Sequence, residues 1–182
     1  MVKNVATRSK WMPMPSALGL HLPDSASTQA LGTALGRAFP TPLAGAVVYL
    51  QGELGSGKTT CVRSLLHALG VTTPVRSPTY TLVDHYSVAE LDCAHVDLYR
   101  LRSAAEIDEL GLRDLLGPKR LMLIEWPEKG GAALPPADLK LTLEYAGEAR
   151  AGAVRAASSF GETWLLNLES DSSLLPYVSN LT

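Results

Sequence analysis

Cysteine is scarce in this chain of 182 residues, which contains only Cys61 and Cys93. Their wide spacing matches neither a C-x-x-C motif nor a zinc-binding arrangement. Two unpaired thiols favour a reducing, cytoplasmic location. No run of 18 apolar residues occurs, so we expect no membrane-spanning segment. Lys3, Arg8 and Lys10 precede no continuous apolar stretch, so a secretory signal is not expected either.

Neither sign of charge dominates the sequence. Sixteen Lys and Arg residues stand against 18 Asp and Glu residues, which gives a formal net charge of −2. A global electrostatic attraction to nucleic acid or to a membrane surface is therefore excluded. Any role with RNA must come through a partner protein or a small basic patch. The hydrophobic content of 46% and the length fit one globular domain with a sizeable core.

The most informative stretch is Gly52–Thr59, which reads G-x-x-x-x-G-K-[ST]. An apolar run at 46–50 precedes it and has the composition of a buried strand. Apolar residues follow it at helical spacing, and a glycine stands where the helix should end: Val62, Leu65, Leu66, Leu69 and Gly70. Strand, glycine-rich loop and helix are together the context of a phosphate-binding loop. The plain alternative, a glycine-rich turn before an ordinary helix, is disfavoured by these flanks.

Successive backbone N–H groups and the positive end of the helix dipole would hold a polyphosphate at this loop. Lys58 should face solvent and reach the terminal phosphates, and the Thr59 hydroxyl should ligate magnesium. We therefore predict that the chain binds a nucleoside triphosphate. The residues expected to bind it are Glu53, Leu54, Gly55, Ser56, Gly57, Lys58, Thr59 and Thr60.

Two acids on expected strands could complete a magnesium triphosphate site. Glu125 ends the apolar run 121–124, the position of an acid that holds the metal or its waters. Asp97 lies within another apolar run and could orient or deprotonate an attacking water. Asp97 could instead pair with Arg100 or Arg102, and Glu125 could face solvent. Which acid is the direct metal ligand stays open.

The segment 77–81 carries hydroxyl groups at alternate positions around a proline. Thr79 or Thr81 could reach the γ-phosphate or its metal, as in a switch segment, although Ser-Pro-Thr is also ordinary turn chemistry. Trp126 directly follows Glu125. Its indole could lie near the base, face a partner or simply pack at the rim of the fold.

The order of these segments predicts an α/β fold with a central, mainly parallel sheet, helices on both faces and a C-terminal antiparallel hairpin. Residues 1–16 should form a disordered basic tail, 17–168 the domain and 169–182 a flexible serine-rich tail. Expected strands cover 19–22, 46–50, 80–83, 94–99, 121–125 and 139–145, with a hairpin partner at 153–158 after a turn at 147–152. Expected helices run from a cap at 24–27 to Pro40, after the loop, and over 103–116 with an interruption at Gly111.

Five strings together resemble the TsaE family (also called YjeE), the ATPases of bacterial tRNA threonylcarbamoyladenosine synthesis. They are GELGSGKTT at 52–60, RSPTYTLV at 76–83, HVDLYRL at 95–101, ELGLRD at 109–114 and LIEWPEKG at 123–130. Their order and spacing agree over roughly residues 18–167. The later strings make the resemblance far more specific than the loop alone does.

The resemblance implies a P-loop NTPase fold with ATP and Mg²⁺ as cofactors. It implies TsaD and TsaB as partners, which transfer a threonylcarbamoyl group to the adenosine beside the anticodon, so that tRNA is reached indirectly. Hydrolysis should be slow without these partners, and a monomer is favoured. By motif position, Thr59 and Glu125 would bind magnesium. The catalytic residues would be Lys58, Asp97 and Thr79. The nucleotide would also be approached by Trp126, Arg150 and residues 24–28.

Two rival enzyme classes fit the sequence less well. A small-metabolite kinase needs a lid of clustered arginines, and Arg100, Arg102 and Arg113 supply only a thin version of one. A regulatory GTPase needs an Asn-Lys-x-Asp motif, which does not occur in the sequence. A nucleotide-sensing subunit that seldom hydrolyses ATP alone overlaps with the favoured interpretation.

Overall fold

The structure is a computed structural model that describes residues 17–41, 45–103 and 106–179. The tail expected at 1–16 lies outside these residues. Eight strands form one sheet: β1 (Ala17–Leu22), β2 (Ala46–Gln51), β3 (Val83–Val88), β4 (Leu91–Asp97), β5 (Arg120–Glu125), β6 (Leu139–Ala146), β7 (Ala149–Ala156) and β8 (Val178–Ser179). The α-helices are α1 (Ser25–Arg37), α2 (Lys58–Leu69), α3 (Glu106–Glu109) and α4 (Ser159–Glu169). Four short 3₁₀ helices complete the fold: η1 (Leu112–Leu115), η2 (Pro127–Lys129), η3 (Gly131–Ala133) and η4 (Ser172–Tyr177).

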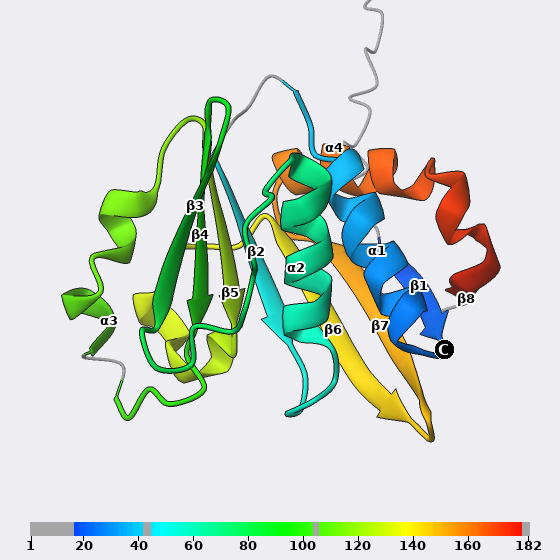
Figure 1. Ribbon diagram of the computed structural model, residues 1–182, viewed down its shortest axis with the longest axis horizontal. Coiled ribbons are helices and arrows are strands. Elements are labelled where there is room, and N and C mark those ends of the chain that lie inside the picture. Colours follow the sequence, from blue (N-terminus) through cyan, green and yellow to red (C-terminus); the bar gives the residue numbers. More distant parts are fainter. Residues whose placement is uncertain (1–16, 42–44, 104–105, 180–182) are drawn as a thin grey trace, which may run out of the picture.

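The strand order across the sheet is β3-β4-β5-β2-β6-β7-β1-β8 (Figure 1). The four central strands β4, β5, β2 and β6 run parallel to one another. Every pairing outside them is antiparallel, including the predicted hairpin of β6 and β7. The α/β fold is confirmed, with the parallel part confined to the middle of the sheet. The carboxyl ends of the parallel strands meet at one edge, where ligands bind in open α/β sheets.

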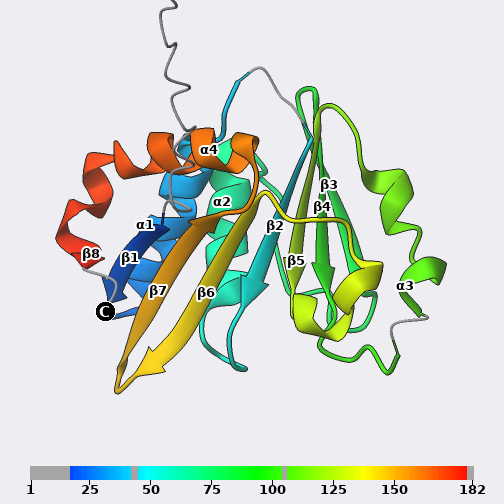
Figure 2. The ribbon, with the colours of Figure 1, turned by 180° about the vertical axis from the view of Figure 1, so that it is seen from behind.

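The three longest helices cover one side of the sheet. Helices α1 and α2 lie side by side across the strands in Figure 1 and lie behind them in Figure 2. Their apolar residues join those of α4 in one core cluster. The other side has a smaller core over β4, β5 and β2, covered by short helices that contribute Ile107 and Leu112. Side chains of β6 such as Lys140 and Glu144 are exposed there, so helices cover this second side only in part.

Helix α1 begins where the sequence predicts. Asp24 is the N-cap: its carboxylate accepts the Ser27 N–H at 2.7 Å, and its own N–H donates to the Ser27 hydroxyl at 3.1 Å. The end of α1 is held by α4, a helix that the sequence analysis did not identify. The indole N–H of Trp164 donates to the Leu35 carbonyl at 2.9 Å, and the Asn167 amide donates to the Ala38 carbonyl at 3.1 Å. Helix α4 therefore satisfies carbonyls that the end of α1 leaves unpaired.

Two strand predictions were wrong in their boundaries. Residues 80–82 form a turn in which Leu82 has φ 64°, so β3 begins at Val83, where the expected strand 80–83 ends, and continues to Val88. The second hairpin strand starts at Ala149, directly after a tight turn in which Gly147 has φ 67°. Small residues predominate in the first half of β7. Because their polarity alternates only weakly, the period-two pattern that predicts a strand is weak there.

The C-terminal segment also differs from the flexible tail expected from residue 169. Residues 172–177 form η4, and β8 pairs with β1 at the edge of the sheet. Leu174 is buried in the main core, which fixes this segment despite its serine content. The helix expected over 103–116 is divided into α3 and η1 around Gly111, which has φ 60°. Among the residues described, no helix is long and apolar enough to cross a membrane.

Candidate functional site

The loop between β2 and α2 closes tightly against the rest of the fold. Gly52 has φ 138° and Gly57 has φ 110°, conformations that favour glycine. A Cβ atom on Gly52 would lie 2.1 Å from the Leu143 carbonyl oxygen, and one on Gly57 would lie 3.1 Å from Thr28 Cγ2. Gly57 is the N-cap of α2 and has no side chain, so the N-cap residue offers no side-chain acceptor to the first N–H groups of the helix. The short distance between the Gly57 position and Thr28 shows that the segment 24–28 lies directly against the loop.

Lys58 is buried, contrary to the prediction that it faces solvent. Only 4% of its surface is exposed, and Nζ donates to the carbonyls of Gly52 and Glu53, each at 2.8 Å. Burial lowers the pKa of the ammonium, and the negative charges of nearby acids, Glu125 foremost, act against this. The curvature of the loop brings two carbonyls to the ammonium, and a buried cation needs such partners. Lys58 therefore lies within the loop rather than above it.

Thr59 and Glu125 meet at the first turn of α2. The Thr59 hydroxyl donates to the Glu125 carboxylate, at 2.8 Å from Oε1 and 3.1 Å from Oε2. His95 Nε2 lies 2.9 Å from the same Oε1, and its Nδ1 is buried without a partner. Glu125 is 2% exposed, which excludes the alternative of a strand-end charge facing solvent. Two strands and a helix thus fix this carboxylate.

Asp97 ends β4, directly opposite Glu125 in the register of β4 and β5. Its Oδ2 accepts hydrogen bonds from the hydroxyls of Ser77 and Thr79, and its Oδ1 accepts the Tyr99 N–H at 2.9 Å. Among the described residues it forms no ion pair, so the alternative pairing with an arginine is wrong. Asp97 therefore anchors the hydroxyl-rich segment beside the loop. Thr81 lies apart from this group and bonds to Asp84 instead.

Trp126 connects the loop to the strand ends. Its backbone has φ 60°, an uncommon conformation for a bulky residue that turns the chain sharply after β5. Lys58 Nζ lies 4.1 Å from the centre of the Trp126 ring, and the Tyr99 ring is 5.1 Å away. Trp126 is half-buried, so one part of the indole packs and another borders open space.

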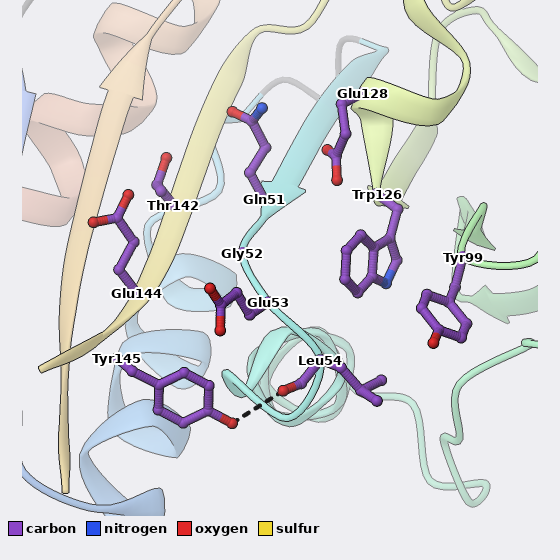
Figure 3. Close-up of a pocket in the computed structure, with 10 residues that line it drawn as sticks. All are labelled: Gln51, Gly52, Glu53, Leu54, Tyr99, Trp126, Glu128, Thr142, Glu144 and Tyr145. Carbon is purple, nitrogen blue, oxygen red and sulfur yellow. Dashed lines mark hydrogen bonds between the residues drawn. The ribbon is translucent and has the colours of Figure 1, made fainter. Parts of the chain in front are cut away.

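A cavity of about 590 Å³ brings most of the predicted site residues together. Those lining it are Leu54, Gly55, Gly57, Lys58, Thr59, Thr60, Thr79, Asp97, Glu125 and Trp126. Ser56 is fully buried beneath the loop, and its hydroxyl has no partner. Glu53 lines a second cavity of about 760 Å³ (Figure 3). Arg150 lines neither of these two cavities and lies 5.1 Å from the centre of the Tyr145 ring.

Comparison with known proteins identifies the family of this chain. The family model of the threonylcarbamoyl adenosine biosynthesis protein TsaE matches residues 22–153 of this chain. This chain belongs to the TsaE family. The match includes the loop, both acids and strand β6, and ends within β7, before α4. The resemblance seen in the sequence is thereby confirmed.

Several relatives, all named as TsaE proteins, are 34–42% identical to the chain over their aligned residues. The tRNA threonylcarbamoyladenosine biosynthesis protein TsaE of Haemophilus influenzae is 42% identical over 116 residues, which cover 64% of this chain and 73% of that protein. The protein of the same name from Bacillus subtilis is 35% identical over 111 residues, or 61% of this chain and 68% of its own. The crystal structure of Bacillus subtilis YdiB superimposes with a TM-score of 0.69 at 26% identity, covering 87% of this chain and 97% of that one.

Sequence reasoning missed four residues of this candidate site, one of which is Ser77, which lines the loop cavity and donates to Asp97. His95 holds Glu125, while Tyr99 and Arg100 line the loop cavity. His95 could have been found, because it stands two positions before Asp97 on the same strand and so projects from the same face. Tyr99 and Arg100 follow the strand end, where spacing carries no such signal.

Proposed function

We propose that the chain is a Mg²⁺-dependent ATPase of the P-loop class that acts in the synthesis of threonylcarbamoyladenosine in tRNA. The observation that carries the proposal is that one cavity at the β2–α2 loop is lined by Lys58, by the Thr59–Glu125 pair and by Asp97. A cation, a hydroxyl–carboxylate pair and a second acid are the groups that phosphoryl transfer to water requires. Membership of the TsaE family supports the pathway assignment.

The loop suits a polyphosphate because its main chain and its lysine both present donors. The start of α2 carries no side-chain cap, so its N–H groups and the helix dipole can receive a phosphate. Lys58 Nζ has three protons, and an anion can replace the carbonyls of Gly52 and Glu53 as its acceptor. Binding ATP would therefore exchange internal hydrogen bonds of Lys58 for charge-assisted ones.

The chemistry of Thr59 and Glu125 fits magnesium, because both present oxygen atoms near the end of the loop. Within the described residues, His, Cys, Asp and Glu form no cluster of three that could hold a metal by themselves. This agrees with a magnesium ion bound by one or two protein groups together with substrate phosphates. Such an ion would neutralise charge that develops on the phosphate oxygens. His95 would keep the Glu125 carboxylate in place.

Asp97 and Thr79 would govern the attacking water. Asp97 projects from the end of β4 into the same cavity, with its carboxylate held by the hydroxyls of Ser77 and Thr79. A carboxylate fixed in this way can orient a water and accept its proton. Movement of the segment 77–79 would change both groups at once, which suits a switch.

TsaD and TsaB are the proposed partners, with tRNA reached through them. The balance of charge, 16 basic against 18 acidic residues, supports an indirect contact with RNA.

The proposed function is tested by measuring phosphate release from Mg-ATP by this chain alone and with TsaD and TsaB, for the parent and for Asp97→Asn. We expect slow release that the partners accelerate and that the variant loses. Equal release by the variant, or phosphate transfer to a small metabolite in preference to water, would refute the proposal.

A further inference from the structure

The second cavity, of about 760 Å³, has charged groups that the proposed ATP hydrolysis does not use. It lies beside the loop, between the end of β2 and the outward face of β6 (Figure 3). Leu54, Tyr99 and Trp126 line both this cavity and the loop cavity. The Tyr145 hydroxyl donates to the Leu54 carbonyl at 3.0 Å, which joins β6 to the loop. We refer to this second cavity as the acidic cleft.

Three carboxylates line the acidic cleft, those of Glu53, Glu128 and Glu144. No lysine, arginine or histidine is among the lining residues. In the part of the chain that the structure describes, none of the three acids has an ion-pair partner. The nearby cations are engaged elsewhere: Lys58 with loop carbonyls, and Arg150 with the Tyr145 ring and the Glu148 carbonyl. The acidic cleft therefore holds three carboxylates outside any described ion pair, and Lys58 acts on one of them, Glu128, only through its charge.

This charge decides which ligands the acidic cleft can accept. Three carboxylates repel phosphate, so the cleft is unsuited to the triphosphate of a nucleotide. Trp126, Tyr99 and Tyr145 provide aromatic rings along its walls (Figure 3). Aromatic faces and carboxylates both attract a guanidinium or ammonium group. The lining therefore fits a cationic side chain.

The exposed apolar and aromatic side chains at the mouth of the acidic cleft favour a protein ligand over a free cation. Leu54 is 66% exposed, Tyr145 46% and Tyr99 38%. A hydrated metal ion gains nothing from apolar surface of this kind, whereas a peptide buries it on binding. Arginine also combines a planar cation that stacks on aromatic rings with a fork that matches carboxylates.

We propose that the acidic cleft is a docking site for a basic segment of a partner protein, with an arginine side chain inserted between the carboxylates and the aromatic rings. The segment would contact Leu54 and Trp126, which belong to both cavities, so docking would act directly on the β2–α2 loop. This site shares Leu54, Tyr99 and Trp126 with the proposed ATP site, but its charged groups are neither the loop lysine nor the two acids of the loop cavity.

The test uses an acetylated, amidated tetra-arginine peptide and calorimetry at low salt without nucleotide, so its outcome is independent of the proposed ATPase. The variant is Glu128→Gln with Glu144→Gln. The matched control is Glu109→Gln with Glu169→Gln, which removes the same charge from exposed positions on α3 and α4. The neutral tetra-citrulline peptide controls for shape. Equal urea midpoints for all three proteins verify that the variants remain folded.

We expect tetra-arginine to bind the parent and tetra-citrulline not to bind. The cleft variant should raise the dissociation constant about tenfold, since two favourable charge contacts are lost. The control variant should change it less than about twofold. Three results would overturn the proposal: no binding of tetra-arginine to the parent, equal binding of the two peptides, or the same loss of affinity in the cleft and control variants.

Discussion

Replacing Gly52 by alanine tests whether the fold dictates the shape of the β2–α2 loop. Gly52 and Gly117 have nearly the same φ, 138° and 140°, in the region that side chains other than glycine rarely adopt. A Cβ atom on Gly52 would lie 2.1 Å from the Leu143 carbonyl oxygen and 2.8 Å from Ser56 Oγ, whereas one on Gly117 meets nothing within 4 Å. The two substitutions therefore share the backbone strain, and only Gly52→Ala adds a collision.

The expected magnitudes follow from this difference. Strain in a glycine-only conformation costs about 1–3 kcal/mol, which should be the whole effect of Gly117→Ala. At Gly52 the new methyl group lies roughly 1 Å inside ordinary van der Waals contact with main chain, which cannot rotate away as a side chain can. Overpacking of this kind costs a further ~1–3 kcal/mol. Gly52→Ala should also weaken ATP binding, because the Gly52 carbonyl holds Lys58.

Urea unfolding followed by circular dichroism measures both free energies of unfolding, and calorimetry with Mg-ATP measures binding. Gly117→Ala should keep its affinity for ATP, since this residue lies outside both cavities described above. If Gly52→Ala proves no more destabilising than Gly117→Ala, or binds ATP as the parent does, the reasoning about the loop is wrong.

Three further expectations follow from the structure. Glu125→Gln should weaken binding of Mg-ATP while Asp97→Asn retains binding and loses turnover; calorimetry and phosphate release with both variants would reveal reversed roles. Trp164→Phe should lower the free energy of unfolding by about 2–4 kcal/mol, because it removes buried volume and leaves a carbonyl of α1 unpaired; a urea midpoint equal to that of the parent would contradict the role assigned to α4. Burial raises the pKa of both Cys61 and Cys93 to about 12 from 9.0, so the folded thiols hold their protons more tightly and stability should fall as the pH rises above 9.0. Iodoacetamide at pH 8 should label both thiols only after unfolding, and rapid labelling of the folded protein would count against their burial.

Much of the fold follows from local patterns that the sequence displays. The parallel strands β2 and β5 are continuous apolar runs, and α1 and α2 carry their own start and stop residues. Helix α4 was missed because tertiary contacts hold it in place: Trp164 is fully buried and donates a hydrogen bond to a residue 129 positions earlier. The strand β7 was placed too late because Ala and Gly carry little periodic signal.

The candidate site was predicted as a set of residues rather than as a geometry. The motif places Lys58, Thr59 and the two acids in one cavity, as expected. It gives no information about the orientation of Lys58, which depends on how the loop curls back on itself. Spacing along the chain places His95 on the same face as Asp97. It does not reveal the contact of His95 with Glu125 or the lining of the acidic cleft, because these arise from strands that meet only in the folded sheet.

The central claim is that the β2–α2 loop binds Mg-ATP through Lys58. Its most direct test is calorimetric titration of the parent and of Lys58→Met with ATP, with and without Mg²⁺. Methionine retains an unbranched apolar side chain and removes the ammonium group, with its charge and its hydrogen bonds to the Gly52 and Glu53 carbonyls. We expect the parent to bind ATP more tightly with Mg²⁺, and we expect Lys58→Met to bind about 10–100-fold more weakly, the value of one charge-assisted contact. Equal affinity of the two proteins, or no binding of Mg-ATP by the parent, would contradict the account.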